Sequence, residues 1–382
     1  MVDDRVVVRE AASVGHTEGR RGGFSCAEDF RAVEEVLARF LEEQGALSAE
    51  PEVAELVGWV RGSLAGGKQL RPLLCCLGWR AGGGTGPLPP AVARVAASFE
   101  MFHTFAVLHD DVMDDAETRR GRPAAQHLVA ARHRGHAQAQ KLGRDTAILL
   151  GDIALGWSYE LVGTADIDDH RRRRVGRALA TMRTQTVVGQ YLDLVGTDTA
   201  PAGTVEDVGH GAVEDVGHAL RIARGKTAGY TVGWPLHIGA VLAHADETII
   251  EALTRFGLAV GEAFQLRDDL LNVFGHAPTT GKPSGDDLCH RKHTALLALA
   301  WRDADPRQRA RLTQLMDRTS LDETALTEAR TILTDTGARS HIEDLITTRL
   351  DEARQALTET TLPPDITTTL TDLAHHATHR DH

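Results

Sequence analysis

The chain has 382 residues, 42% of them hydrophobic, which suffices for one large domain with a thick core or for two ordinary domains. Its net charge of −12 argues against a nucleic-acid-binding role on electrostatic grounds. The four cysteines include no Cys-x-x-Cys pair, which argues against a disulfide framework or a zinc knuckle and fits a reducing cytoplasm.

Residues 1–25 carry glycines and charges without a sustained period, which predicts a mobile arm and no signal peptide. From Ala27 onward apolar residues recur at helical spacing. The same pattern returns in later segments, for example 92–116, 145–161, 174–194, 249–274 and 338–357. Strand-like alternation is scarce, and prolines mark segment edges. We therefore expect one all-α domain over residues 26–382.

The segment Leu108–Asp115, LHDDVMDD, contains four aspartates: Asp110, Asp111, Asp114 and Asp115. On a helix, Asp110 and Asp114 share a face. Two carboxylates about 6 Å apart repel by about 3 kcal/mol at an effective dielectric constant of about 20. A divalent cation bound between the carboxylates relieves this repulsion. Magnesium is suited to such a site, because it prefers oxygen ligands. The segment therefore predicts a magnesium site, and a solvated acidic helix end is the alternative.

Basic residues suited to phosphate occur in several segments: Lys68 and Arg71 in GGKQLRP, Arg119, Arg120 and Arg122 in TRRGRP, Lys226 in KTAGY, Lys282 in GKPSGDD, and Arg291 and Lys292 in HRKHT. Each of them alone is typical of a solvated surface charge. Magnesium held by few carboxylates takes other ligands from water and substrate phosphates, and arginine forks match diphosphate oxygens. Together they favour a diphosphate substrate beside the acids.

The hexapeptide VEDVGH occurs twice, at residues 205–210 and 213–218. A metal site built from His210 and His218 is conceivable. A local duplication in an exposed loop and helix start explains the repeat better.

The longest weakly polar stretch, residues 228–245, contains Pro235, His237 and His244. We expect it to form a buried core helix, with no transmembrane segment. Pro235 should kink or interrupt that helix, because proline lacks the backbone N–H that the helix needs.

A second acidic pair, Asp268 and Asp269, lies in the apolar segment GEAFQLRDDLLNVFG. Taken alone, the pair fits a salt-bridged structural role as well as it fits a metal site. Two acidic pairs on separate helices of one domain favour a metal cluster held between them.

These motifs resemble the trans-isoprenyl diphosphate synthases, also called polyprenyl synthetases, over about residues 30–380. GGKQLRP is similar to the family's GGKxxRP, DDVMDDAETRRG to DDxxDxxxxRRG, GQYLDL to GQxxDL, Lys226-Thr227-Ala228 to KTA, FQLRDDLLN to FQxxDDxxD, and GKPSGDDLCHRKHT to GKxxGxDxxxxKxT. The resemblance implies a single large helical bundle around a central apolar cavity, and a homodimer.

The resemblance also implies a magnesium-dependent prenyltransferase that joins isopentenyl diphosphate to allylic diphosphates of five to fifteen carbons, giving a linear all-trans product. Asp110 and Asp114, with Asp111 nearby, would hold two of three magnesium ions, and Asp268, with Asp269 beside it, the third. The allylic diphosphate would be clamped by Arg119, Lys226 and Lys282, with Thr227 and Gln265 at the reacting end and Lys292 closing the site. Isopentenyl diphosphate would bind Lys68, Arg71, His103 and Arg120.

Three positions depart from the family pattern or extend it. Gln69 stands where the family often has a basic residue. Asn272 replaces the last aspartate of the second motif, which keeps an oxygen but removes a charge. Asp115 is an extra acid just past the first motif.

The C-terminal helix, with His375, His376, His379 and Arg380, either helps to cover the site or is a solvated helix end.

We expect product length to depend on the depth of the apolar cavity. Phe105 lies five positions before Asp110, about 7–8 Å further along the helix axis. It is followed by the small Ala106. This pattern resembles geranylgeranyl diphosphate synthases and predicts a twenty-carbon product. A farnesyl or twenty-five-carbon product is the alternative, and Phe105 could instead be ordinary core packing.

Two other functions compete with this interpretation. A class I terpene cyclase would carry an Asn/Ser/Glu metal triad, which does not follow Asp269, and aromatic residues make up only 4% of the chain. A non-catalytic partner subunit of a heteromeric synthase would not need these intact aspartates and basic residues. Both are therefore less favoured than a synthase.

Overall fold

The computed structural model describes residues 25–67, 69–198, 216–275 and 285–378. The predicted arm, Lys68, Lys282 and the first VEDVGH copy lie outside these residues. The elements are α2 (Cys26–Gly45), α3 (Pro51–Leu64), α4 (Leu70–Ala81), α5 (Pro90–Met113), β1 (Thr118–Arg119), β2 (Arg122–Pro123), α6 (Ala125–Arg132), α7 (Ala139–Gly163), α8 (Asp169–Asp198), α9 (Val216–Ala223), the π-helix η1 (Arg224–Gly233), α10 (Trp234–Leu242), α11 (Glu247–Phe274), α13 (Asp286–Cys289), α14 (Ala295–Asp303), α15 (Pro306–Met316), α16 (Glu323–Asp335), α17 (Ala338–Thr358) and α18 (Pro364–Thr378).

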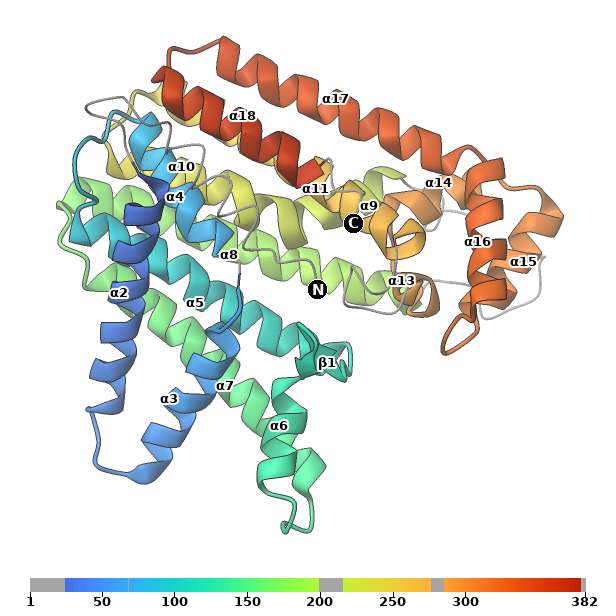
Figure 1. Cartoon of the computed structure of the whole chain (residues 1–382), viewed down its shortest axis with the longest axis horizontal. Coiled ribbons are helices and arrows are strands. Elements are labelled where there is room, and N and C mark those ends of the chain that lie inside the picture. Colours follow the sequence, from blue (N-terminus) through green and yellow to red (C-terminus); the bar gives the residue numbers. More distant parts are fainter. Residues whose placement is uncertain (1–24, 68, 199–215, 276–284, 379–382) are drawn as a thin grey trace.

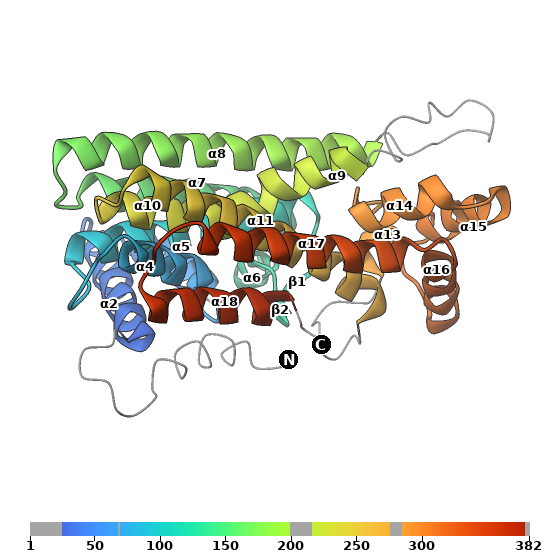
Figure 2. The ribbon, with the colours of Figure 1, turned by 90° about the horizontal axis from the view of Figure 1, so that it is seen from above.

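The helices form a bundle around α5, α10 and α11. Helix α8 runs along one long edge, and α17 and α18 run along the other side of α11 (Figure 2). Helices α2 and α3 lie at one end, and α13 to α16 gather at the other (Figure 1). Buried apolar residues from α2 to α18 join in one core cluster. The predicted all-α fold is confirmed, with one two-stranded hairpin, and the shared core supports our proposal of a single domain over residues 26–382.

Among the described helices, α5 is the one long and apolar enough to cross a membrane, with a mean hydropathy of 1.3 over its best window. That window is 67% buried inside the molecule, because α2, α4 and α7 pack around the helix. Its apolar composition is therefore explained by its central place in the bundle.

The helix changes type at Pro235 but does not break, so the predicted interruption takes the form of a π-helix ahead of the proline. The π-helix η1 ends at Gly233, and Pro235 lies in the first turn of α10. The Trp234 amide donates to the Gly229 carbonyl across a π-type turn, and this shift in register precedes the proline, which has no backbone N–H to donate. The whole apolar stretch up to Leu242 is mostly buried, as expected for a core helix.

Candidate active site

The first acidic motif lies at the end of α5. Asp110 and Asp111 belong to its last turn, and Asp114 caps the helix. The Asp114 amide still donates to the Asp110 carbonyl at 2.8 Å, so the two residues keep the one-turn spacing predicted from the sequence. Asp115 turns away with φ 48° and forms an exposed ion pair with Arg144 at 2.9 Å.

Lys226 joins this motif to α8. Its Nζ lies 2.5 Å from Asp193 Oδ2 and 3.2 Å from Asp110 Oδ1. Gln190 Nε2 donates to the same Asp110 oxygen at 3.2 Å. Burial alone would raise the pKa of Asp110, but Lys226, Arg119 and the other nearby cations outweigh it and hold the pKa below its usual value.

The position of Lys226 depends on glycines. A Cβ on Gly189 of α8 would lie 2.2 Å from the Lys226 backbone nitrogen, and Gly225 meets the Gln185 carbonyl on the same helix. Only glycine permits so close a backbone approach. The π-helix that carries Lys226 and the half-buried Thr227 is therefore pressed against α8 at the level of the acids.

Arg119 reaches the acids from the hairpin. Its Nε donates to Asp111 Oδ1 at 2.7 Å, and its Nη2 lies 3.4 Å from Asp110 Oδ2. Arg120 and Gly121 form the turn with φ of 53° and 71°, the left-handed pair that a two-residue hairpin turn requires. The turn folds the chain back, so Arg119 returns to the motif just before it.

The second acidic pair occupies two different environments. Asp268 is exposed, whereas Asp269 is buried and accepts from Gln265 Nε2 at 2.9 Å. Burial raises the pKa of Asp269 well above its usual value, and the neighbouring Asp287 raises it further. Asn272, which departs from the family pattern, accepts from the Asp287 amide at 3.2 Å and so holds that acid beside the pair.

Lys292 connects the two acidic motifs. Its Nζ lies 3.3 Å from Asp114 Oδ2 and 3.7 Å from Asp287 Oδ1. Burial would lower the pKa of Lys292, but Asp287 and Asp114 raise it above its usual value. A single charged amine thus spans from the end of α5 to the acids beside α11.

A second basic cluster consists of Arg71, His103 and Arg120. Arg71 Nη2 donates to Thr231 Oγ1 at 2.9 Å, and its guanidinium stands 4.4 Å from the centre of the Tyr230 ring. The Tyr230 hydroxyl lies 3.4 Å from His103 Nδ1. Burial, followed by the charges of Arg71 and Arg120, lowers the pKa of His103 well below its usual value, so the imidazole is neutral.

Phe105 lies on α5 between two aromatic neighbours. Its ring centre is 5.4 Å from that of Phe102 and 4.8 Å from that of His109. His109 fits against α7 because Gly151 has no side chain, since a Cβ there would lie 2.2 Å from the imidazole. Phe105 and the adjacent Ala106 are both half-buried.

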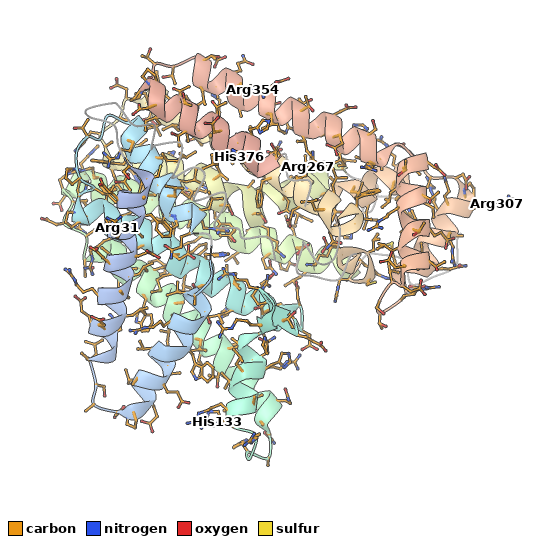
Figure 3. The ribbon with its side chains drawn as sticks, in the orientation of Figure 1. Arg31, His133, Arg267, Arg307, Arg354 and His376 are labelled. Atoms are coloured by element: carbon orange, nitrogen blue, oxygen red, sulfur yellow. The ribbon has the colours of Figure 1, made fainter. Side chains whose placement is uncertain are left out.

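The end of α18 lies beside the second acidic motif. Arg267, the residue before Asp268, donates from Nε to the Thr378 carbonyl at 2.7 Å and pairs with Glu343. Figure 3 labels Arg267 on α11 and His376 on the neighbouring α18. His375 and His376 belong to this helix, whereas His379 and Arg380 lie outside the described residues.

The donor set fits magnesium. In the part of the chain that the structure describes, no three ligating side chains form a ready-made cation site. Basic residues neutralise the carboxylates instead: Lys226 at Asp110, Arg119 at Asp111, and Lys292 at Asp114. Magnesium needs only one or two carboxylates and completes its shell with water and phosphate oxygens, so these hard oxygen donors suit it.

Sequence reasoning missed several residues of this region. Asp193 and Gln190 lie in the GQYLDL motif, where their spacing of three on a helix could have indicated a shared face. Asp287 is the second acid of GDD. Glu100, buried beside Arg71 and Arg120, is an isolated charge in an apolar helix, which was its only signal.

Comparisons with known proteins support a common origin. The family model described as polyprenyl synthetase matches residues 55–333. Geranylgeranyl diphosphate synthase of Mycobacterium tuberculosis is 37% identical over 213 residues, which cover 56% of this chain and 52% of that protein. Geranylfarnesyl diphosphate synthase of Aeropyrum pernix is 33% identical over 296 residues, which cover 77% and 83%.

Among solved structures, the chain is similar to geranylgeranyl pyrophosphate synthase from Corynebacterium glutamicum, complexed with isoprenyl diphosphate and magnesium. The TM-score is 0.84 at 32% sequence identity, and the superposition covers 94% of this chain and all of that one. The relatives' names differ in product length.

Proposed function

The chain belongs to the polyprenyl synthetase family of trans-prenyl diphosphate synthases, and from this premise we propose that it is a magnesium-dependent prenyltransferase that condenses isopentenyl diphosphate with allylic diphosphates. The observation that carries this proposal is the bridge of Lys292 between Asp114 and Asp287. Because one amine contacts an acid of α5 and an acid beside α11, the bridge supports a diphosphate held between these two groups of acids.

Asp110, Asp111 and Asp114 on one wall, and Asp268 and Asp269 on the other, would hold the magnesium ions, of which three are expected with substrate bound. The bound metal supplies positive charge that stabilises the diphosphate leaving group. Asp268 is exposed and so is accessible to a metal ion, whereas Asp269 is buried. Asp268 is therefore the better candidate for a direct magnesium ligand, and Asp269 for a residue that supports the site from behind.

Arg119 and Lys226 would bind the allylic diphosphate, with Lys282. Both described cations lie within 3.4 Å of Asp110, which supports a role in stabilising the negative charge that would develop as the allylic C–O bond breaks. Thr227 and Gln265 would line the reacting end, and Lys292 would close the site over it.

Isopentenyl diphosphate would bind Arg71, His103 and Arg120, with Lys68. A neutral His103 can donate one hydrogen bond to a phosphate oxygen while the arginines supply the charge. The double bond of isopentenyl diphosphate attacks the allylic cation, and the adduct then loses a proton. By family analogy, the released diphosphate is the base.

We propose geranylgeranyl diphosphate as the product, with Phe105 as the floor for the growing chain and Ala106 leaving room beside it. The aromatic contacts of Phe105 with Phe102 and His109 give that floor a fixed position. Farnesyl diphosphate and a twenty-five-carbon diphosphate are the alternatives.

We also propose a homodimer, located in the cytoplasm. Exposed apolar side chains gather on α7 and α8: Ile148, Leu149, Tyr159, Val187, Val188, Tyr191, Leu194 and Val195. Arg183 joins the two helices, with its guanidinium 3.5 Å from the centre of the Tyr159 ring. An apolar surface of this extent favours association with a second copy.

Incubation of the purified protein with magnesium, isopentenyl diphosphate and primers of five, ten or fifteen carbons tests the proposal. A linear twenty-carbon diphosphate is expected. A hydrocarbon product would indicate a terpene cyclase, and no turnover would indicate a partner subunit without activity of its own.

A further inference from the structure

Glu100 is a buried carboxylate that the proposed chemistry does not use. It lies in the middle of α5, with 2% of its surface exposed, ten residues before Asp110. Within the described residues, its Oε2 has no hydrogen-bond partner. Gln69 Oε1 and Arg71 Nε are likewise buried without a partner. Orphaned polar atoms are costly, so their grouping beside one proposed substrate site calls for a functional explanation.

The backbone at the start of α4 converges on this carboxylate. A Cβ on Gly67 would lie 2.9 Å from Glu100 Oε1 and 3.3 Å from both terminal nitrogens of Arg120. Gln69, two residues later, has a φ of 46°, which is a strained conformation for a residue with a side chain. The loop is therefore held close to Glu100 and Arg120 at some cost.

The charges around Glu100 explain why an acid belongs here. Arg71 and Arg120 come from different segments and repel each other, and the negative charge of Glu100 attracts both. Burial raises the pKa of Glu100 above its usual value, and the two arginines offset only part of that rise. A carboxylate in a site for an anion opposes the ligand by direct Coulomb interaction. Its presence is favourable only if holding both guanidinium groups in place gains more than this repulsion costs.

We propose that Glu100 is a positioning residue, which holds Arg71 and Arg120 in the orientation that receives the diphosphate of the second substrate. The inference rests on the proposed function and goes beyond it, because the proposed function assigns only cations and His103 to this site. Glu100 does not touch the substrate and acts through the two arginines.

The test is Glu100→Gln, which keeps the shape and removes the charge. We expect the Kd of isopentenyl diphosphate alone, measured by calorimetry, to rise at least about tenfold, because removing one member of a buried charge cluster releases the others. The KM for isopentenyl diphosphate should rise in parallel, while the KM for the allylic primer stays within about threefold. Glu100→Asp, which keeps the charge, should recover part of the affinity.

Glu262→Gln is the matched control. Glu262 is a buried acid on α11 with 4% of its surface exposed, and it forms direct ion pairs with Arg224 and, at 2.9 Å, with Arg349. It should lower the melting temperature without a selective change in the Kd of isopentenyl diphosphate.

Three outcomes would overturn the inference. Tighter binding in Glu100→Gln would mean that the carboxylate merely repels the ligand, and unchanged binding would mean that it is not needed. An equal rise of both KM values would indicate general damage to the fold. A wild-type protein without turnover contradicts the proposed function, whereas turnover with unaltered Kd in Glu100→Gln contradicts this inference alone.

Discussion

Asp110 is contacted by three polar side chains of the site, those of Lys226, Arg119 and Gln190. Asp110→Asn keeps the size and removes the charge that would hold magnesium. We expect kcat to fall by about 10²–10³, the usual cost of losing one preorganised electrostatic group. Steady-state kinetics at saturating magnesium measure this.

Asp115→Asn serves as the control, because this acid is exposed and pairs with the exposed Arg144. Its kcat should match that of the wild type. Equal losses in both variants would mean that the acidic segment acts through its overall charge and not through particular ligands.

Phe105 carries the prediction of product length. Phe105→Ala should extend the product distribution beyond twenty carbons, because it removes the ring that faces Phe102 and His109. Ala106→Phe should shorten it by filling the adjacent space. Chromatography of the dephosphorylated products measures both, and an unchanged distribution in Phe105→Ala would assign the ring to ordinary packing.

The sequence predicted those charged site residues that lie within motifs rich in charged residues. Arg119, Lys226 and Lys292 do come together with the first acidic motif, although their roles remain proposals. Glu100 could not be assigned from sequence, because one acid in an apolar helix says nothing about which cations meet it in space.

Among the elements, the π-helix η1 depends most on close backbone contact. Gly189→Ala would place a Cβ 2.2 Å from the Lys226 nitrogen and push η1 away from α8. We expect a loss of about 1–3 kcal/mol in stability and at least a tenfold fall in kcat, because displacing a reactive group by about 1 Å is costly. Thermal unfolding and kinetics measure the two effects.

Gly176→Ala, also on α8, provides a matched control, since a Cβ there meets nothing within 4 Å. It should stabilise the protein by about 0.5–1 kcal/mol through helix propensity and leave kcat unchanged. If Gly189→Ala behaved in the same way, the close packing of η1 on α8 would have no functional role.

Long helices such as α5, α7, α8, α11 and α17 were predictable, because apolar residues recur at helical spacing over many of their turns. The β1–β2 hairpin was not, because two residues per strand leave no pattern, and only the Arg120–Gly121 turn determines it. The π-helix was also missed, because Pro235 predicted that the helix is interrupted but not that the turns before it are π-helical.

For the whole molecule, the exposed apolar surface of α7 and α8 predicts a dimer. Tyr191 of α8 belongs to this surface and is 61% exposed, so Tyr191→Glu should place a charge in the interface and produce monomers. Sedimentation velocity measures the change in mass.

Leu47→Glu is the control, because Leu47 is 75% exposed and belongs to the turn after α2, not to α7 or α8. This variant should remain dimeric. A wild-type protein that sediments as a monomer at micromolar concentration would contradict the dimer directly.

In the proposed mechanism, acids from α5 and α11 hold divalent ions around one diphosphate. A crystal grown with manganese and an unreactive thiolo analogue of an allylic diphosphate tests it, because manganese gives an anomalous signal that magnesium lacks. We predict anomalous peaks bridging the diphosphate to Asp110 and Asp114 on one side and to Asp268 on the other. A diphosphate bound elsewhere, with these carboxylates directed into bulk solvent and no peak between them, would contradict the account.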